Sequence, residues 1–216
     1  MPPQSLKKLF LFAVLGCSLG FFPASKVFSA ELKAPQLAIE NISNALKDKM
    51  LDENFVKDFA LINIFVNKTI DPHVDFNRIT ALVLGKLWKR VTKEQKKLFK
   101  KEFHTLLVRT YSRAFLEFKD WSIRYLPLKI KENSKKIIVK TEILQPGIQP
   151  LAVNYRMVRN KRGEWKIYDI MIEGVSLVTN YRTSIKNEFK KSGSLSTVIE
   201  LFAKRNAEAL AKENNS

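Results

Sequence analysis

The apolar positions of this chain follow a helical period in its first half. Apolar residues recur at spacings of three and four over residues 34–51, 54–71, 76–88 and 93–118. This spacing places the apolar side chains on one face of a helix, where they can pack against a core. The sequence therefore predicts four helices before residue 120, of which the last is the longest.

Polar residues at the ends of these segments predict where each helix begins or stops. Pro35 suits a helix start, and Asp71, which precedes a proline, is pushed out of the α region and should end the second helix. Asp75 is a candidate N-cap for the third helix. Thr92-Lys93-Glu94-Gln95 has the form of a capping box that starts the fourth. Gly85, inside the third helix, is interpreted as a close-packing position between helices.

The period changes to two after Trp121. Alternating segments cover residues 121–131, 136–144 and 150–158, and a further β-rich segment ends at Gly174. Pro127 in the first segment indicates an edge or bulged strand. Short turns between the segments predict an antiparallel meander of about four or five strands, with helices covering one face. The fold class is therefore α+β, with a twisted antiparallel sheet packed against several helices.

The helical period returns after Gly174. An apolar run, Val175 to Val178, leads to Asn180, which we expect near the N-cap of a helix because apolar residues recur every four positions after it. A break at Ser192-Gly193 precedes a last helix to Lys212, and residues 213–216 should be a disordered tail. We expect a single domain over residues 30–212.

The N-terminus is typical of an export signal. Lys7 and Lys8 precede an apolar stretch that is too short and too rich in glycine to span a bilayer, and small residues follow. We expect residues 1–29 to be a cleaved signal peptide, with the junction at Ser29/Ala30, and the mature protein to lie in the periplasm without a transmembrane segment. Cys17 loosely resembles a lipoprotein acceptor site, which leaves lipidation as the second interpretation. Cleavage at residue 29 would leave no cysteine, and thiol catalysis would then be excluded.

The charge is strongly positive. Removing residues 1–29, which hold three lysines and no acid, lowers the net charge from +17 to about +14. Such a balance favours anionic partners, namely nucleic acid, an acidic membrane surface or an acidic protein face. Export argues against nucleic acid. Many of these lysines also serve solubility alone.

The sequence contains no recognisable catalytic or metal motif. His73 and His104 have no partner at metal-ligand spacing. The run Gly174 to Val178 begins like a nucleophile elbow but lacks its second glycine. Asp169 and Glu173, like Asp75, are better interpreted as caps or turn locks than as an acid–base pair. We expect no enzyme and no metal.

One set of residues spread over most of the chain resembles the MlaC family, also called the toluene-tolerance family, of periplasmic phospholipid-shuttle proteins. The residues that carry the resemblance are Asp75-Phe76, Val83-Leu84-Gly85, Trp88, Thr92, Gln95, Phe99, Phe103, Leu106-Leu107, Thr110-Tyr111, Val153, Tyr155, Trp165-Lys166, Tyr168-Asp169, Glu173-Gly174-Val175-Ser176 and Asn180-Tyr181-Arg182. The Lys-rich segment at 93–101 departs from the family pattern.

The resemblance implies a monomeric carrier that holds phospholipid as cargo and needs no other cofactor. It would shuttle glycerophospholipid between an outer-membrane lipoprotein/porin complex and an inner-membrane Mla ABC transporter complex, which maintains the lipid asymmetry of the outer membrane. The fold it implies is a sheet and helices around an apolar pocket for acyl chains.

From the periodicity and this resemblance together, we expect an apolar pocket wall with one basic residue at its rim. The predicted wall residues are Phe76, Ile79, Val83, Phe103, Leu107, Tyr111, Val139, Val153, Tyr155, Ile170, Val175 and Tyr181. Arg182 is the predicted rim residue, with an ordinary surface charge at a helix start as the alternative.

Two other classes of protein stay open. One is an exported, non-catalytic adaptor with a solid core, whose basic face binds an acidic protein or lipopolysaccharide. The other, ranked last, is an enzyme on an α+β scaffold. Bound phospholipid in the purified protein would distinguish the carrier from both.

Overall fold

The computed structural model describes residues 31–117 and 120–213. The predictions of a signal peptide over residues 1–29 and of lipidation at Cys17 lie outside the described residues, as does most of the predicted C-terminal tail. α7 includes Glu213, so the described part of the chain ends within a helix.

The chain begins with three helices and two irregular turns. They are α1 (Ala34–Met50), α2 (Glu53–Lys57), α3 (Phe59–Phe65), a π-helical turn (Val66–Ile70) and a 3₁₀ turn (Asp71–His73). The predicted continuous helix over 54–71 is wrong. Asp58 has an extended backbone, and its side chain accepts hydrogen bonds from the N–H groups of Ala60 and Leu61, so it ends one helix and caps the next.

Two further helices carry the predicted caps. α4 (Phe76–Leu84) starts at Asp75, whose carboxylate accepts from the Arg78 N–H at 3.0 Å. α5 (Lys93–Glu117) starts at the Thr92–Gln95 capping box, in which each side chain accepts from the other residue's N–H at 3.1 Å. Both caps are confirmed.

Gly85 does not lie inside a helix, so its predicted role is wrong. Its φ of +56° ends α4, and a 3₁₀ turn (Gly85–Lys89) follows. A Cβ at this position would lie 3.8 Å from Arg182 Nε, an ordinary contact distance. Positive φ, which glycine adopts without strain, is therefore the reason for glycine here, and close packing between helices is not.

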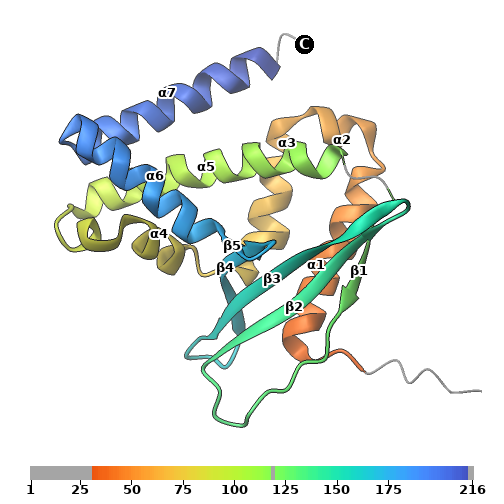
Figure 1. The fold of residues 1–216 in the computed structure, drawn as a ribbon. Helices are drawn as coiled ribbons and strands as arrows, with labels where there is room; N and C mark the ends of the chain where they lie inside the picture. Colours follow the sequence, from red (N-terminus) through yellow and green to blue (C-terminus); the bar gives the residue numbers. More distant parts are fainter. Residues whose placement is uncertain (1–30, 118–119, 214–216) are drawn as a thin grey trace, which may run out of the picture. The chain divides into compact units, whose positions relative to one another are not determined.

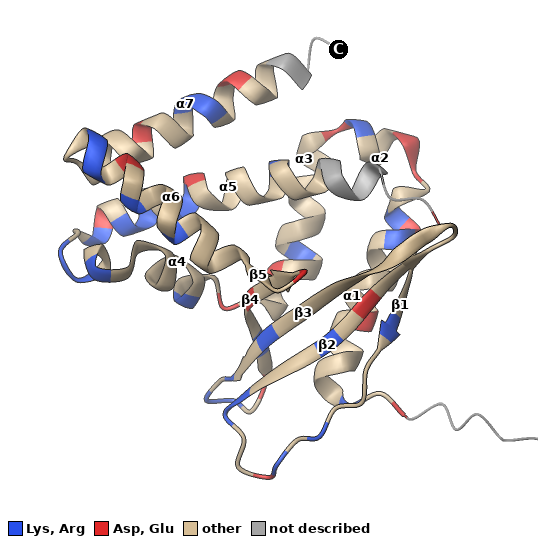
Figure 2. Ribbon diagram, viewed as in Figure 1, with Lys and Arg blue, Asp and Glu red and all other residues tan. Residues whose placement is uncertain are grey.

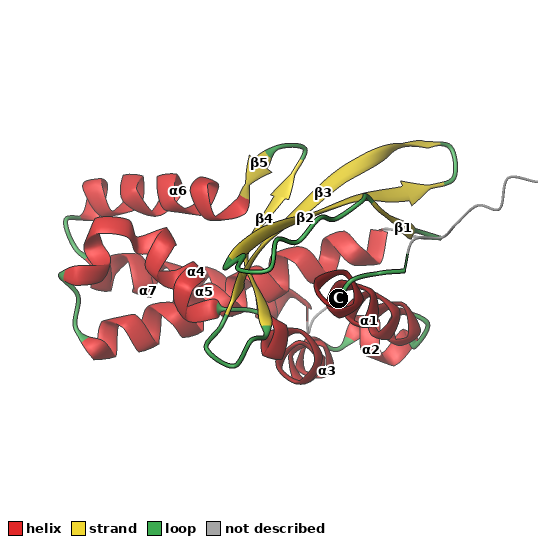
Figure 3. Cartoon of the chain, turned by 90° about the horizontal axis from the view of Figure 1, so that it is seen from below, coloured by secondary structure: helices red, strands yellow, loops and turns green. Residues whose placement is uncertain are grey.

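The second half of the chain forms one five-stranded antiparallel sheet (Figures 1 and 3). Its strands follow chain order: β1 (Ser122–Tyr125), β2 (Lys136–Gln145), β3 (Ile148–Arg159), β4 (Trp165–Ile172) and β5 (Val175–Ser176). The predicted α+β class and the meander are confirmed. β1 is an edge strand, as Pro127 indicated, and α1 packs on the sheet through Ile39.

Two helices complete the chain: α6 (Leu177–Ser192) and α7 (Leu195–Glu213). The predicted cap at Asn180 is wrong. Ser176 is the N-cap, because its Oγ accepts from the Thr179 N–H at 3.1 Å, and α6 begins before Asn180. Gly193, with φ of +70°, ends α6.

The buried apolar residues form separate clusters. The bundle cluster joins α4, α5, α6 and α7 and comprises Val83, Leu84, Phe99, Phe103, Val178, Ile185, Leu195, Val198, Ile199 and Phe202. The sheet cluster comprises Ile39, Val139, Met157 and Ile167. A third cluster, under α2 and α3, comprises Phe55, Ile62, Phe65 and Val108. Within the described residues, no helix has the length and apolar character that a bilayer span requires.

Candidate functional site

The helical part of the predicted wall belongs to the bundle cluster. Its members there are Phe76, Ile79, Val83, Phe103, Leu107 and Tyr181. The ring of Phe103 meets the ring of Tyr181 edge to face at 5.1 Å between centroids, and the ring of Phe76 lies 6.1 Å from Phe103. Aromatic pairs at these distances attract each other beyond the area that they bury. The α4, α5 and α6 side of the wall is therefore built largely from rings.

Tyr111 joins this group through a polar contact. Its hydroxyl lies in hydrogen-bonding contact with that of Tyr181, and burial followed by this neighbour raises the pKa of Tyr111 well above its usual value. Both tyrosines come from helices that face the sheet side of the bundle, α5 and α6. A neutral hydroxyl pair leaves this part of the wall uncharged, which suits contact with apolar chains.

The sheet part of the predicted wall lies on a single face. In the antiparallel register Val139 pairs with Tyr155, Tyr155 pairs with Ile170, and Val153 lies two residues before Tyr155 on β3. Paired residues, and residues two apart on one strand, point to the same side of a sheet. Burial raises the pKa of Tyr155 to about 12, so this face is also uncharged near neutral pH.

Exposure sorts the predicted wall into two groups. Four residues are almost wholly enclosed by protein: Val83, Phe103, Val139 and Val153. Seven keep part of their surface exposed: Phe76, Ile79, Leu107, Tyr111, Tyr155, Ile170 and Tyr181. A guest that enters between the helices and the sheet would first touch the partly exposed group. That these residues line a lipid site stays a prediction.

The last two predicted residues lie apart from these groups. Val175 on β5 is 59% exposed. Arg182 Nε donates a hydrogen bond of 2.5 Å to the backbone carbonyl of Leu82, so its guanidinium group joins α6 to the end of α4. That Arg182 lies at a pocket rim also stays a prediction. A lipid headgroup that bound the Arg182 guanidinium group would have to compete with the Leu82 carbonyl.

A buried carboxylate holds the corner where the sheet meets α6. Asp169 on β4 is only 3% exposed and accepts three hydrogen bonds. Ser176 Oγ donates at 2.7 Å, the Val178 N–H at 3.1 Å and Arg156 Nη1 at 3.1 Å. A carboxylate beside the first N–H groups of a helix is also favoured by the helix dipole. Asp169 therefore fixes β3, β4 and the start of α6 to one another, which is the turn-locking role predicted for it.

The β4–β5 turn is fixed to the neighbouring strand in a similar way. Glu173 and Gly174 both have positive φ, 47° and 79°, which is the backbone of a tight two-residue hairpin turn. The Glu173 carboxylate accepts from the Ala152 N–H at 2.6 Å, and the Glu173 N–H donates to the Ala152 carbonyl at 2.9 Å. These bonds explain a glutamate in a left-handed conformation, and they confirm its predicted role as a turn lock.

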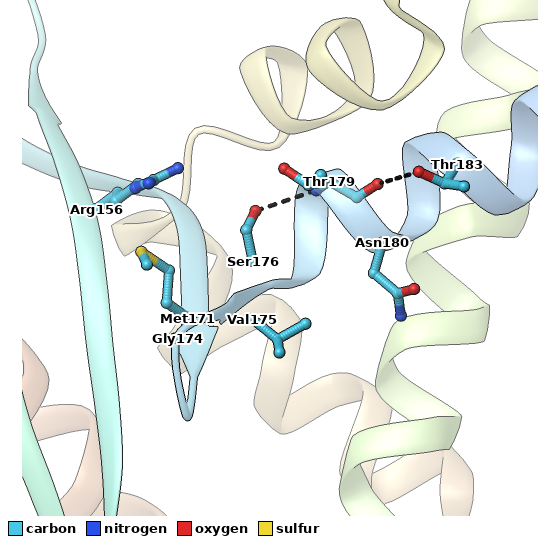
Figure 4. A pocket seen from close by; sticks show the side chains of 8 residues that line it. All are labelled: Arg156, Met171, Gly174, Val175, Ser176, Thr179, Asn180 and Thr183. Atoms are coloured by element: carbon cyan, nitrogen blue, oxygen red, sulfur yellow. Dashed lines mark hydrogen bonds between the residues drawn. The ribbon is translucent and has the colours of Figure 1, made fainter.

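A surface pocket of about 430 Å³ lies against this corner. Its lining residues, drawn in Figure 4, are Arg156, Met171, Gly174, Val175, Ser176, Thr179, Asn180 and Thr183. Arg156 pairs with Asp169, so both point to the face of the sheet opposite Tyr155 and Ile170. The pocket combines one cationic group with hydroxyls, an amide and two apolar side chains.

Only Val175 of the pocket lining was among the predicted site residues. A signal for some of the others exists in the chain, because Gly174, Ser176 and Asn180 all belong to the segment that resembles the MlaC pattern. The pattern does not tell which of them face a pocket. That information requires the pairing of β4 with β3 and β5.

The histidines take part in local contacts. His104 Nε2 lies 3.0 Å from Asp71 Oδ2, and the His104 ring packs edge-on against Phe76 at 5.2 Å. Within residues 31–117 and 120–213, no three His, Cys, Asp or Glu side chains lie close enough together to hold a metal ion.

The fold agrees with that of a known protein. A solved structure from Ralstonia solanacearum, a phospholipid-binding protein in complex with a phospholipid, matches with a TM-score of 0.75 and 25% identity, over 83% of this chain and 99% of that one. The chain thus has the α+β fold of a phospholipid-binding protein, with a five-stranded antiparallel sheet and seven described α-helices.

The sequence comparisons define the family. Residues 40–204 match the MlaC protein family, which is most of the chain, and the chain belongs to this family. It is 26% identical over 179 residues to the intermembrane phospholipid transport system binding protein MlaC of Haemophilus influenzae, which covers 82% of each chain. It is 25% identical over 153 residues to the toluene tolerance protein Ttg2D of Pseudomonas putida, covering 70% of each. The resemblance inferred from the sequence is therefore confirmed.

Proposed function

We propose that this protein is a periplasmic phospholipid carrier. It takes a glycerophospholipid from a membrane complex on one side of the periplasm and delivers it to one on the other side. The partners follow from the family: an outer-membrane lipoprotein/porin complex and an inner-membrane ABC transporter complex. The protein acts as a monomer and as a carrier without catalysis, and in this way it contributes to the lipid asymmetry of the outer membrane.

The observation that carries this proposal is the shared fold with a relative that was solved in complex with a phospholipid. The match extends over 99% of the relative's chain, so almost all of that chain has a counterpart in this fold. The name of the Haemophilus influenzae relative, a binding protein of an intermembrane phospholipid transport system, points to the same task.

The physical demand on a carrier explains why an apolar interior is needed. Each acyl CH₂ group exposed to water costs roughly 0.8 kcal/mol, so two bare acyl chains would cost on the order of 20 kcal/mol. Phe76, Ile79, Leu107 and Tyr181 pack against the bundle cluster, Tyr155 and Ile170 pack against the sheet cluster, and none of the seven partly exposed wall residues carries a charge. Acyl chains bound against these apolar surfaces would stay out of water during the crossing.

The contacts between wall residues suit a site that opens and closes. Ring and methyl contacts leave no unpaired hydrogen-bond donor when they separate, so these contacts can give way to acyl chains at little polar cost. The Asp169 corner keeps the start of α6 attached to the sheet through its bonds to Ser176 and Val178 while this happens. The headgroup would remain at the surface, in contact with water.

Lipid extraction from the purified protein tests the proposal directly. The protein is purified without detergent, extracted with organic solvent, and its lipids are quantified by mass spectrometry against protein concentration. We expect about one phospholipid per chain, and loss of that lipid when the same preparation is unfolded in denaturant and washed. Absence of phospholipid from repeated preparations would contradict the carrier and favour the adaptor with a solid core.

Transfer between vesicles tests the activity itself. Donor vesicles that contain a fluorescent phospholipid and its quencher are mixed with unlabelled acceptor vesicles, and dequenching is followed with and without the protein. A carrier should raise the transfer rate in proportion to its concentration. The protein denatured by heat is the control, and a rate equal to that control would contradict the proposal.

A further inference from the structure

A cluster of basic residues lies at one end of the helical bundle, away from the Asp169 corner. Between positions 86 and 101 the chain carries eight basic residues and one acid, Glu94. Lys190 and Lys191 lie at the end of α6, and Gln95 Nε2 donates to Ser196 Oγ at 3.1 Å, which brings the start of α7 to the start of α5. Figure 2 shows this concentration of lysine and arginine where α5 begins and α6 meets α7.

We define this surface as the basic tip. Its members are Lys86, Lys89, Arg90, Lys93, Lys96, Lys97, Lys100, Lys101, Lys190 and Lys191. Eight of these side chains belong to exposed residues, and only Lys96 and Lys100 are partly buried.

Most of the basic tip has no acidic partner. Among its members only Lys101 and Lys191 form ion pairs with described residues, at 3.8 Å from Glu102 and 3.7 Å from Glu188. Lys96 and Lys100 instead contact the rings of Trp88 and Phe76. The tip therefore presents a positive field that the protein itself does not neutralise.

The arrangement of these lysines costs helix stability. Lys93, Lys97 and Lys101 stand four residues apart on α5, as do Lys96 and Lys100, and like charges at this spacing repel each other. Such a local conflict with stability is expected at surfaces that serve binding. Solubility alone would be served as well by charges of mixed sign.

Apolar side chains accompany the charges. Leu98 on α5 is 42% exposed, and Trp88 is partly exposed with Lys96 Nζ 4.6 Å from its ring centre. Lysine next to tryptophan and leucine is the combination that binds the boundary between lipid headgroups and acyl chains. A purely electrostatic contact would not need the exposed leucine.

We infer that the basic tip binds the surface of an anionic phospholipid bilayer. An acidic protein face is the other class of partner, but protein interfaces are enriched in arginine and depleted in lysine, and nine of the ten residues of the tip are lysine. A lysine ammonium on a flexible stem suits a diffuse field of phosphate groups better than a fixed bidentate pair. This inference does not depend on whether the interior of the protein holds lipid.

Vesicle sedimentation tests the inference. The purified protein is mixed with sucrose-loaded vesicles of phosphatidylcholine, either pure or with 30 mol% phosphatidylglycerol. We expect binding only to the anionic vesicles, and a steep loss of binding at high salt, because the Debye length falls from about 10 Å at 0.1 M to about 3 Å at 1 M. Equal binding to both kinds of vesicle, or binding to neither, would overturn the inference. Binding to soluble polyglutamate alone would favour an acidic protein partner.

Two triple variants with equal charge locate the binding surface. Lys86→Gln, Lys93→Gln and Lys97→Gln together should reduce the partition coefficient on anionic vesicles about 100-fold, since each lysine near such a surface contributes roughly 1 kcal/mol. The matched control replaces three exposed lysines in the segment between β1 and β2, Lys129→Gln, Lys131→Gln and Lys135→Gln, and should reduce the partition coefficient less than threefold. Equal reductions would overturn the inference, because net charge alone would then explain binding.

Two further measurements separate folding from binding. Circular dichroism should give a melting temperature for the tip variant no lower than that of the parent, since these three lysines form no ion pair among the described residues and Lys93 and Lys97 repel each other. Leu98→Ala should weaken binding about two- to threefold at a salt concentration that suppresses the electrostatic part. No change at Leu98 would overturn the apolar part of the contact.

Discussion

The centre of the helical bundle and the corner between the sheet and α6 are stabilised by opposite kinds of interaction. At the centre, the ring centroid of Phe103 lies 5.6 Å from that of Phe99 and 5.1 Å from that of Tyr181. At the corner, the Asp169 carboxylate accepts three hydrogen bonds and is 3% exposed. Packing between rings tolerates small displacements, whereas a buried carboxylate requires its donors at fixed positions.

This difference suggests a division of labour within a lipid carrier. The part that would separate to admit acyl chains is held mainly by ring and apolar contacts, with a few directional bonds such as that of Arg182 to Leu82. The part that keeps the sheet attached to α6 is held by a buried network of hydrogen bonds. The following variants test this comparison, in order of the expected size of the effect.

Phe103→Ala should give the largest loss of stability. The ring is 1% exposed and contacts Phe76, Phe99 and Tyr181. Removing such a ring leaves a cavity and typically lowers the free energy of unfolding by about 3–5 kcal/mol. Urea unfolding measures this loss of free energy, with Leu98→Ala as the control on the same helix. A loss below about 1 kcal/mol would mean that Phe103 lines open space instead of closing the core.

Asp169→Ala should destabilise the corner. The change leaves the Val178 N–H, the Ser176 hydroxyl and the Arg156 guanidinium without their acceptor, and we expect a loss of about 2–3 kcal/mol because the Arg156 side chain is 36% exposed and can reach water. Hydrogen exchange should also speed up at the Val178 amide.

The control for Asp169 is Glu164→Ala, which removes an exposed carboxylate that bonds Asn160 and should lower the free energy of unfolding clearly less than Asp169→Ala does. Equal effects of the two changes would show that the buried network does not hold α6 to the sheet.

Tyr155→Phe should change how steeply the free energy of unfolding falls at alkaline pH. Burial raises the pKa of Tyr155 from its usual value of 10 to about 12, so the unfolded chain loses this proton at a lower pH than the folded protein does. The contribution of Tyr155 is complete below pH 10 and is lost as the pH rises from 10 to 12, about 3 kcal/mol in all.

The phenylalanine variant has no proton to lose at this position. Its free energy of unfolding, from urea titrations at pH 8 and pH 11.5, should fall by less than that of the parent protein. The same decline in both proteins would mean that water reaches the hydroxyl of Tyr155 freely.

Val175→Trp should have the smallest effect on stability and the most selective effect on cargo. Val175 is 59% exposed and lines the pocket of about 430 Å³, so an indole there should change the free energy of unfolding by less than about 0.5 kcal/mol. We expect at least a twofold drop in extracted phospholipid per chain. Ile148→Trp, at a residue 61% exposed on β3 and outside the pocket lining, is the control. A large loss of stability would instead make Val175 part of the core.

Much of the fold follows from local patterns in the sequence. The caps at Asp75 and Thr92 need only neighbours within three or four residues, so they can be recognised before any tertiary contact is known. The meander follows from the alternation over residues 136–158 and from short turns, and the turn-locking role of Glu173 follows from its place before Gly174.

Two of the errors occur where a residue of another element contributes to the local structure, whereas the break at Asp58 rests on bonds within three residues. The predicted N-cap at Asn180 is replaced by Ser176, because Asp169 on the preceding strand bonds the hydroxyl of Ser176 and the N–H of Val178. Gly85 ends α4 with positive φ, where Arg182, almost a hundred positions later, bonds the end of that helix.

The sequence by itself determined the class of fold, the family and the set of apolar residues that can face a ligand. The tertiary structure alone decided which of these are enclosed, such as Val83 and Val139, and which keep exposed surface, such as Tyr155 and Tyr181. The physical reason is that periodicity is a property of one segment, whereas burial depends on contacts between segments. Periodicity records which side of a helix or strand is apolar, but burial depends on how closely another element approaches that side, and no single segment contains that information.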